Sequence, residues 1–245
     1  MKNLFHHLLL IILIVSCRQD SQEMSTGLLW SIKAKNGKES YIFGTIHLYP
    51  KDELTISERA VSKLRYCKTL ALERDINNEE QQKLFIDSIK PHSILDTYGI
   101  IYTHYNPQLE NMEGGLLRIA KENNLSVTGL ESANEVLSII NNIPSQNKIR
   151  EKQETLNLYK KAIQLYKGES IGAFADIYLD QEFGKVLRKL LVDQRNKNWI
   201  DDIESLIEKD ETFIAVGMGH LGGEKGILNL LKTKGYNLKR VDKQN

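Results

Sequence analysis

Four residues able to carry acid–base or metal chemistry follow apolar runs in this 245-residue chain. His47 ends "SYIFGTIH", Glu73 ends "LALE", Glu131 ends "LSVTGLE" and His220 follows "TFIAVGMG". Ligands gather at the carboxyl ends of strands in sheets covered by helices, so we expect these four catalytic candidates at one edge. Two imidazoles with one or two carboxylates suit a divalent ion such as Zn²⁺, Mn²⁺ or Co²⁺, which lowers the pKa of bound water.

Both histidines end a Gly-x-x-His motif, beginning at Gly44 and at Gly217. Glycine lacks Cβ, so the backbone can turn sharply there or admit a ligand closely. Backbone N–H groups near His220, at the start of the last long helix, could hold a carboxylate or an oxyanion. The glycines around His220 that leave room for this are Gly219, Gly222 and Gly223.

Arg195 and Asn196 are further candidates, for substrate binding, within "LLVDQRNKNWI". A polar pair inside a helical segment is usually an exposed face, yet the surrounding residues are apolar. Because arginine binds carboxylates bidentately, contact with a substrate or with a ligand residue is the functional interpretation.

Each candidate also has a purely structural interpretation. A histidine at a strand end often serves as a cap or packs at the core edge, and Glu73 and Glu131 could pair with Lys or Arg at the sheet edge. The chain has no HExxH, paired CxxC, Gly-x-Ser-x-Gly or P-loop motif. The commonest zinc-peptidase, zinc-ribbon, serine-hydrolase and nucleotide sites are therefore excluded.

Turn signals and apolar periodicity predict the elements that position these residues. Two alternating runs around Asn36-Gly37 predict a hairpin, and the pairs Thr55/Glu58 and Ser132/Glu135 predict capping boxes. Segment 91–108, with two of the four prolines, is predicted to be a loop. The other predicted elements are helices over 55–67, 78–90, 107–124, 132–140 and 223–235, strands over 68–74, 125–131, 212–221 and 236–241, and helical segments throughout 148–208.

Alternating strands and helices predict an α/β fold with a central sheet flanked by helices. The leading hairpin makes that sheet mixed. The block at 148–208 lies between strands and is predicted to be a helical insertion or cap within one domain spanning 28–245.

The first residues are predicted to be a targeting signal. "MKNLFHHLLLIILIVSC" has a charged start and an apolar run too short for a stable membrane span. A small residue before Cys17 resembles a bacterial lipobox, which predicts a signal peptide over 1–16, lipidation of Cys17 and a tether over 17–27. The protein is then expected in the cell envelope, anchored to a membrane by lipid. The alternative is an ordinary signal peptide with an incidental cysteine.

The net charge and the cysteine content argue against a nucleic-acid-binding protein and against a disulfide-bonded one. The net charge of +1 and the absence of DNA- or RNA-binding motifs argue against nucleic acid as a partner. With Cys17 lipidated, Cys67 has no partner for an intramolecular disulfide, and its place in an apolar helical pattern predicts a buried small residue.

The motifs together resemble the TraB/PrgY/GumN family, which is related to the Tiki metalloproteases. The resemblance rests on "LLWSIKAKNGKESYIFGTIHLYP", "LALERDI", "TGLES", "DQRNKNWI" and "FIAVGMGHLGGEKGILNLLKTKGYNLKRV". It covers nearly the whole mature chain and is weakest over 141–190. It implies a sheet with two similar halves, each contributing one Gly-x-x-His to a shared cleft.

The resemblance also implies an activity. Tiki-type members are peptidases that need a divalent ion, with the site carried here by His47, Glu73 and His220. TraB and PrgY members are linked to control of peptide pheromones, by degradation or sequestration. Related folds include erythromycin esterase and a haem-binding lipoprotein.

These observations lead to one main hypothesis and two alternatives. The first is a metal-dependent hydrolase, a peptidase, in which His47 and His220 ligate the ion. Glu73 is then the third ligand or the general base, while Glu131, Arg195 and Asn196 orient ligands or substrate. The alternatives are a protein that binds peptides or small ligands without turnover, and one that captures haem or metal. The sequence leaves the oligomeric state open.

Overall fold

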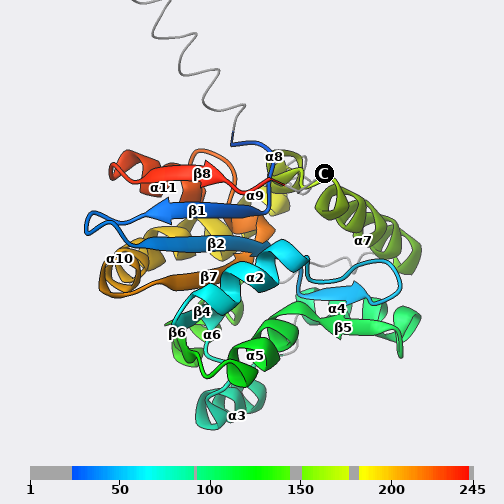
Figure 1. The fold of residues 1–245 in the computed structure, drawn as a ribbon. Helices are drawn as coiled ribbons and strands as arrows, with labels where there is room; N and C mark the ends of the chain where they lie inside the picture. The colour runs from blue at the N-terminus through cyan, green and yellow to red at the C-terminus, as the bar shows by residue number, and fades with distance from the viewer. Residues whose placement is uncertain (1–23, 91–92, 144–150, 177–181, 243–245) are drawn as a thin grey trace, which may run out of the picture.

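The protein is described by a computed structural model that covers residues 24–90, 93–143, 151–176 and 182–242 (Figure 1). The predicted signal peptide and Cys17 lie outside these residues, as does most of the predicted tether. None of the helices within the described ranges is long and apolar enough to cross a membrane.

A six-stranded mixed sheet with the order β6-β4-β7-β2-β1-β8 forms the centre. Its strands are β1 (Leu29–Lys33), β2 (Glu39–Thr45), β4 (Thr69–Arg74), β6 (Ser126–Glu131), β7 (Thr212–Gly217) and β8 (Asn237–Arg240). Strands β6, β4, β7 and β2 are parallel, whereas β1 is antiparallel to both β2 and β8. The prediction of a mixed α/β sheet is confirmed.

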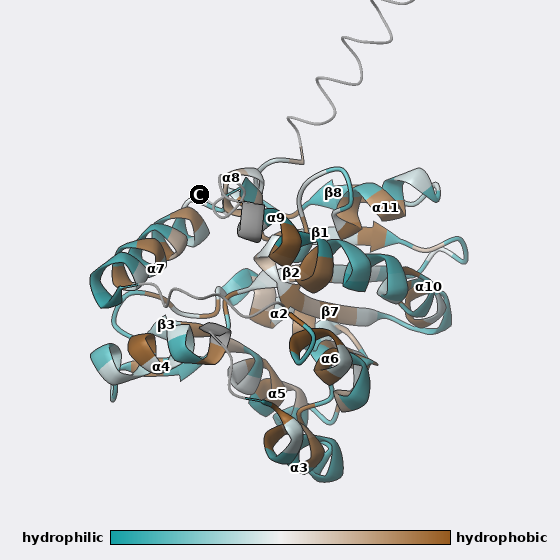
Figure 2. Ribbon diagram, turned by 180° about the vertical axis from the view of Figure 1, so that it is seen from behind, coloured by the Kyte–Doolittle hydropathy of each residue, from teal (hydrophilic) through white to brown (hydrophobic). Residues whose placement is uncertain are grey.

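Helices cover both faces of this sheet. The helices α2 (Glu58–Tyr66) and α5 (Met112–Glu122) lie on the face seen in Figure 1. Figure 2, from behind, shows α6 (Ala133–Ile140) and α10 (Gln194–Lys209) on the other face. The α11 helix (Ile227–Thr233) also packs beside β8. The central strands are consequently apolar and almost fully buried, as expected for parallel strands with both faces covered.

A smaller lobe stands beside the carboxyl ends of the parallel strands (Figure 1). Its two-stranded sheet pairs β3 (Leu48–Pro50) with β5 (Leu109–Asn111), and α4 (Ser93–Tyr105) packs against α7 (Lys152–Lys167). The β3 strand begins directly after His47, and β5 ends directly before α5. The chain therefore enters this lobe directly after His47, next to the predicted site.

The remaining helices have these bounds: α3 (Glu79–Ser88), α8 (Ile171–Asp176), α9 (Glu182–Arg188), a π-helical turn η1 (Lys189–Asp193) and a 3₁₀ turn η2 (Met218–His220). The helical character predicted for 148–208 is confirmed in its described residues, which form α7 to α10.

The predicted turns and caps are mostly correct. Gly37 has φ +88 at the β1–β2 turn, and Gly235 has φ +89 just after α11. Such angles favour glycine, as the sequence indicated. The Ser132/Glu135 capping box is present, but α2 is capped by Ser57 and not by Thr55. Ser57 lies directly before the first helical residue, where its hydroxyl accepts from the N–H of Ala60.

The predicted loop over 91–108 is wrong, because most of it forms α4 and His104 lies in that helix. Pro91 and Pro107 flank this helix in the sequence and do not interrupt it. Similarly, the helix predicted over 107–124 begins only at Met112, since the residues before it form β5.

Candidate active site

Three of the predicted site residues meet beside Gly217, where β7 ends. A Cβ atom built on Gly217 would lie 3.3 Å from Glu73 Oε1, 3.7 Å from His220 Cδ2 and 3.8 Å from His47 Nε2. The backbone N–H of Gly217 donates to Glu73 Oε1 at 2.7 Å. The carboxyl ends of β2, β4 and β7 therefore bring together residues far apart in sequence, as predicted from their position after apolar runs.

Asn196 fixes the orientation and the tautomer of the His220 ring. Its amide Nδ2 donates to the carbonyls of His220 (3.1 Å) and Lys225 (2.8 Å), which turns its Oδ1 toward His220 Nδ1 at 2.6 Å. Because Oδ1 can only accept, Nδ1 of His220 carries the proton. Burial lowers the pKa of His220 to about 3, so the ring is neutral and its Nε2 carries a lone pair, which faces Arg195 Nη1 at 3.4 Å.

The Nε2 atom of His220 faces Glu73, whose Oε1 lies 3.6 Å away. Two ligands of one tetrahedral ion, each bonded at about 2.1 Å, stand about 3.4 Å apart. The pair thus has the spacing of neighbouring ligands.

Arg195 joins the two predicted carboxylates. Its Nη2 donates to Glu73 Oε2 at 2.7 Å and to Glu131, and its Nε donates to both Glu131 oxygens at 3.1 Å. Trp199 Nε1 adds a bond to Glu131 at 3.3 Å. Glu131 is therefore a partner of Arg195, as the structural interpretation proposed, and the guanidinium links it to Glu73 and His220.

The electrostatics of the two carboxylates differ. Burial would raise the pKa of Glu73, but Arg195 and the surrounding donors lower it far below its usual value. Burial raises the pKa of Glu131 despite the same arginine. Glu73 is thus held as a carboxylate, which makes it a weak base and a suitable metal ligand.

Arg195 is only 8% exposed and Asn196 is fully buried, so the alternative of an exposed helix face is wrong. The π-helical turn η1 directly precedes both residues, and Arg195 Nη1 donates back to its Leu191 carbonyl at 3.0 Å. Such turns shift side chains relative to a regular helix and recur at functional sites.

Sequence reasoning missed Glu113, the second residue of α5. Its Oε1 accepts from His47 Nδ1 at 2.8 Å and from the Thr45 hydroxyl at 2.6 Å. The charge of Glu113 raises the pKa of His47. An acidic residue in the first turn of a helix matches the helix dipole, so the sequence alone gave no functional signal.

The other predicted glycines border this site in different ways. A Cβ on Gly44 would clash with Leu221 and Met218, so Gly44 allows η2 to pack closely on β2. Gly219 faces the ring of Phe174 in α8. These two glycines therefore permit close packing and do not open the site.

The α7 helix holds the backbone around His47 by two tyrosine hydroxyls. Tyr166 donates to the Gly44 carbonyl and Tyr159 to the Leu48 carbonyl, each at 3.0 Å. Both rings are buried. The helical segment at 148–208 thus supports the loop that carries His47.

Tyr166→Phe is expected to lower the free energy of unfolding by about 1 kcal/mol, because the buried Gly44 carbonyl loses its donor. Urea denaturation followed by circular dichroism measures the change. Tyr102→Phe is the matched control, since that ring is 54% exposed. Equal stability of the two variants would contradict the expected role of the hydroxyl.

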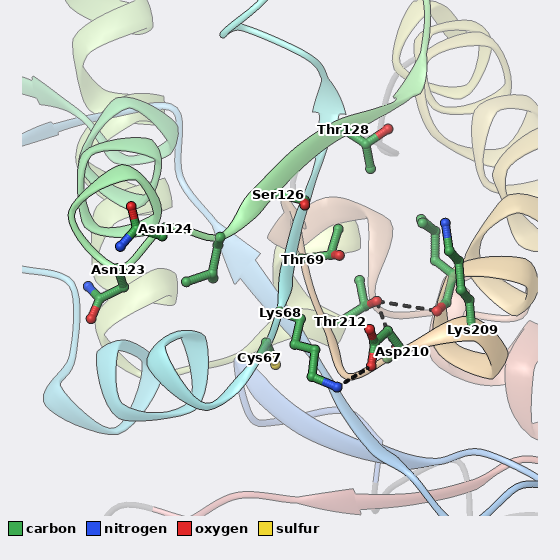
Figure 3. A pocket seen from close by; sticks show the side chains of 12 residues that line it. Cys67, Lys68, Thr69, Asn123, Asn124, Ser126, Thr128, Lys209, Asp210 and Thr212 are labelled. Carbon is green, nitrogen blue, oxygen red and sulfur yellow. Dashed lines mark hydrogen bonds and ion pairs between the residues drawn. The ribbon is translucent and has the colours of Figure 1, made fainter.

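A separate hollow of about 610 Å³ lies at the opposite edge, by the amino ends of β4, β6 and β7 (Figure 3). Its charged wall includes Lys68, whose Nζ lies 2.9 Å from Asp210 Oδ1. None of the predicted site residues lines it. The candidate site is therefore the carboxyl edge.

Comparison with known families agrees with the motifs and the fold. Residues 28–99 and 97–240 match the profile of the TraB/PrgY/gumN family. The chain belongs to the TraB/PrgY/gumN family. Searches of curated proteins and of solved structures give no match. The sequence resemblance is thus confirmed, and the match of this TraB/PrgY/gumN member runs through the segment 141–190 where its motifs were weakest.

Proposed function

We propose that this protein is a metal-dependent hydrolase, acting on peptides, with its site at the carboxyl ends of β2, β4 and β7. The observation that carries the proposal is the convergence of His47 Nε2, the His220 ring and Glu73 Oε1 around Gly217. Two histidines and one glutamate are a donor set used by catalytic zinc sites.

The donor set fits a cation in two respects. Each ring has its Nδ1 occupied, by Glu113 or by Asn196, which leaves Nε2 for a ligand. Arg195 binds the carboxylates of both Glu73 and Glu131, so the negative charge of this pair exceeds the positive charge of the arginine. Within the described ranges, no group of three or more His, Cys, Asp or Glu side chains is arranged so that it could hold a metal ion without a change of side-chain position. Arg195 lies against both Glu73 and His220, so coordination of one ion by both groups requires the guanidinium to move away from them.

His47, His220 and Glu73 would hold the ion, with Mn²⁺, Co²⁺ and Zn²⁺ as candidates. When bound, such an ion polarises the scissile carbonyl and lowers the pKa of a water molecule. Asn196 orients the His220 ring and keeps its proton on Nδ1. Arg195 fixes Glu73 and Glu131 and adds positive charge to the site, which would stabilise negative charge that develops on a substrate.

The test is hydrolysis of a peptide library by the purified full-length chain with added Mn²⁺ or Co²⁺. Activity should be lost with a chelator and in His47→Ala and His220→Ala. His104→Ala, in an exposed part of α4, is the matched control. No cleavage, or cleavage that His47→Ala leaves unchanged, would reject the proposal. Peptide retained in chelator would favour a binding protein, and a Soret shift lost in histidine variants would favour haem capture.

Gly217→Ala is expected to lower hydrolytic activity by about tenfold or more, because its methyl group would enter the space between the three side chains. The φ of Gly217 is −52, so alanine adds no backbone strain. Gly99→Ala is the control, since nothing lies within 4 Å of its added Cβ. Full activity of Gly217→Ala would mean that the reaction does not use this space.

The predicted lipid anchor is part of the same proposal. Lipidation of Cys17 would hold the hydrolase on a membrane in the cell envelope, with the site facing peptides outside the cytoplasm. Metabolic labelling with a fatty acid, lost in Cys17→Ser, would test this.

A further inference from the structure

Glu113 is a buried carboxylate that has no role in the hydrolysis proposed for His47, Glu73 and His220. It is 8% exposed, and its Oε1 binds both His47 Nδ1 and the Thr45 hydroxyl. Its Oε2 is buried without a hydrogen-bond partner. Burying a carboxylate is costly, so its contact with His47 needs an explanation beyond packing.

The junction of β5 and α5, which follow each other directly, binds His47 at its backbone as well as at its ring. Asn111 Nδ2 donates to the His47 carbonyl at 2.9 Å, and Met112 N–H donates to it at 3.3 Å. Glu113 then accepts from the ring at 2.8 Å. Three successive residues therefore fix both the main chain and the imidazole of His47.

His220 has a corresponding partner in Asn196, whose Oδ1 accepts from Nδ1 at 2.6 Å. Both imidazoles of the site are thus held at Nδ1 by a buried side-chain oxygen. This leaves Nε2 of each ring near Glu73 and Gly217. Groups that accept the second N–H of a metal-binding histidine orient the ring and raise its basicity.

We propose that Glu113 is the positioning residue of His47: it fixes the proton on Nδ1 and aims Nε2 at the space beside Gly217. The inference rests on the proposed function only in taking Nε2 as the ligand atom. The hydrogen bond itself is a property of the metal-free chain. Glu113 acts through His47 and is not a ligand.

A structural explanation would be that Glu113 only stabilises the start of α5. A carboxylate in the first turn contributes about 0.3–1 kcal/mol through the helix dipole. In that case the state of the His47 ring would not depend on it. The test therefore measures the protonation of the His47 ring nitrogens directly.

The first measurement is the ring N–H spectrum of the metal-free, full-length chain labelled with ¹⁵N-histidine. We expect a downfield, slowly exchanging Nδ1–H signal that His47→Gln removes. It should persist, less shifted, in Glu113→Gln, which keeps an acceptor oxygen, and disappear in Glu113→Leu. In Glu110→Gln it should be unchanged, because Glu110 contacts Tyr49 and not the site. An unchanged signal in Glu113→Leu would overturn the proposal.

The second measurement is titration with Mn²⁺ alone, with free Mn²⁺ quantified by electron paramagnetic resonance. Glu113→Leu should weaken binding by about 10- to 100-fold, Glu113→Gln by less, and Glu110→Gln not at all. Wild-type affinity in Glu113→Leu, or equal loss in Glu110→Gln, would overturn the role in positioning. If the wild-type chain binds no Mn²⁺, the proposed metal chemistry fails, whereas the N–H signal still decides whether Glu113 positions His47.

Discussion

Arg195→Leu is expected to lower the free energy of unfolding by about 3–5 kcal/mol, because it leaves two buried carboxylates without their cation. The side chains of Glu73 and Glu131 are only 12% and 5% exposed. Arg195 donates to both and also to the Leu191 carbonyl. Urea denaturation in chelator, followed by circular dichroism, measures the loss.

The control is Lys167→Leu, which removes an exposed ion pair with Glu53 at 2.6 Å and should cost less than about 1 kcal/mol. The loss of unfolding free energy caused by Arg195→Leu should also be smaller at pH 5 than at pH 8. Without arginine, the pKa values of the buried carboxyl groups rise, and protonation then relieves the unpaired charge. A loss no larger than in Lys167→Leu, or one independent of pH, would mean that the carboxylates do not depend on Arg195.

The sequence predicted the main sheet and the edge where the candidate residues meet, because both follow from local patterns. Apolar runs such as 212–217 form buried strands, and Asn36-Gly37 closes the hairpin. Since β2, β4 and β7 are parallel, residues at or after their carboxyl ends must meet at one edge. The meeting of His47, Glu73 and His220 needed no long-range information beyond this rule.

Two features of the candidate site that the sequence left open or missed depend on contacts between distant segments. Whether Arg195 faces solvent or the core is decided by a π-helical turn and by Glu131, which lies 64 positions away. Glu113 acquires its role only because β3 pairs with β5 and brings α5 beside His47. Neither pairing leaves a periodic pattern, so neither was visible in the sequence.

The stability of the metal-free protein is expected to fall with acid through His220. Burial lowers the pKa of this ring to about 3, whereas the ordinary value is 6.5. Between these values the unfolded chain binds a proton that the folded chain excludes, so this contribution is present above pH 6.5 and is lost as pH falls toward 3. Full uptake of one proton gives a slope of about 1.4 kcal/mol per pH unit.

His220→Gln should flatten the dependence of the unfolding free energy by about that slope between about pH 4 and 5.5. His47 is protonated over this window in the folded state, where its pKa is raised, and in the unfolded state, where its pKa is the ordinary 6.5. Acidic groups common to both proteins cancel. His104→Gln, altered in exposed α4, should retain the wild-type slope. Urea denaturation in chelator at several pH values measures the unfolding free energy of each variant and its dependence on pH. Parallel curves for wild type and His220→Gln would show that the ring takes up its proton in the folded state, and the neutral His220 on which the ligand assignment depends would then be wrong.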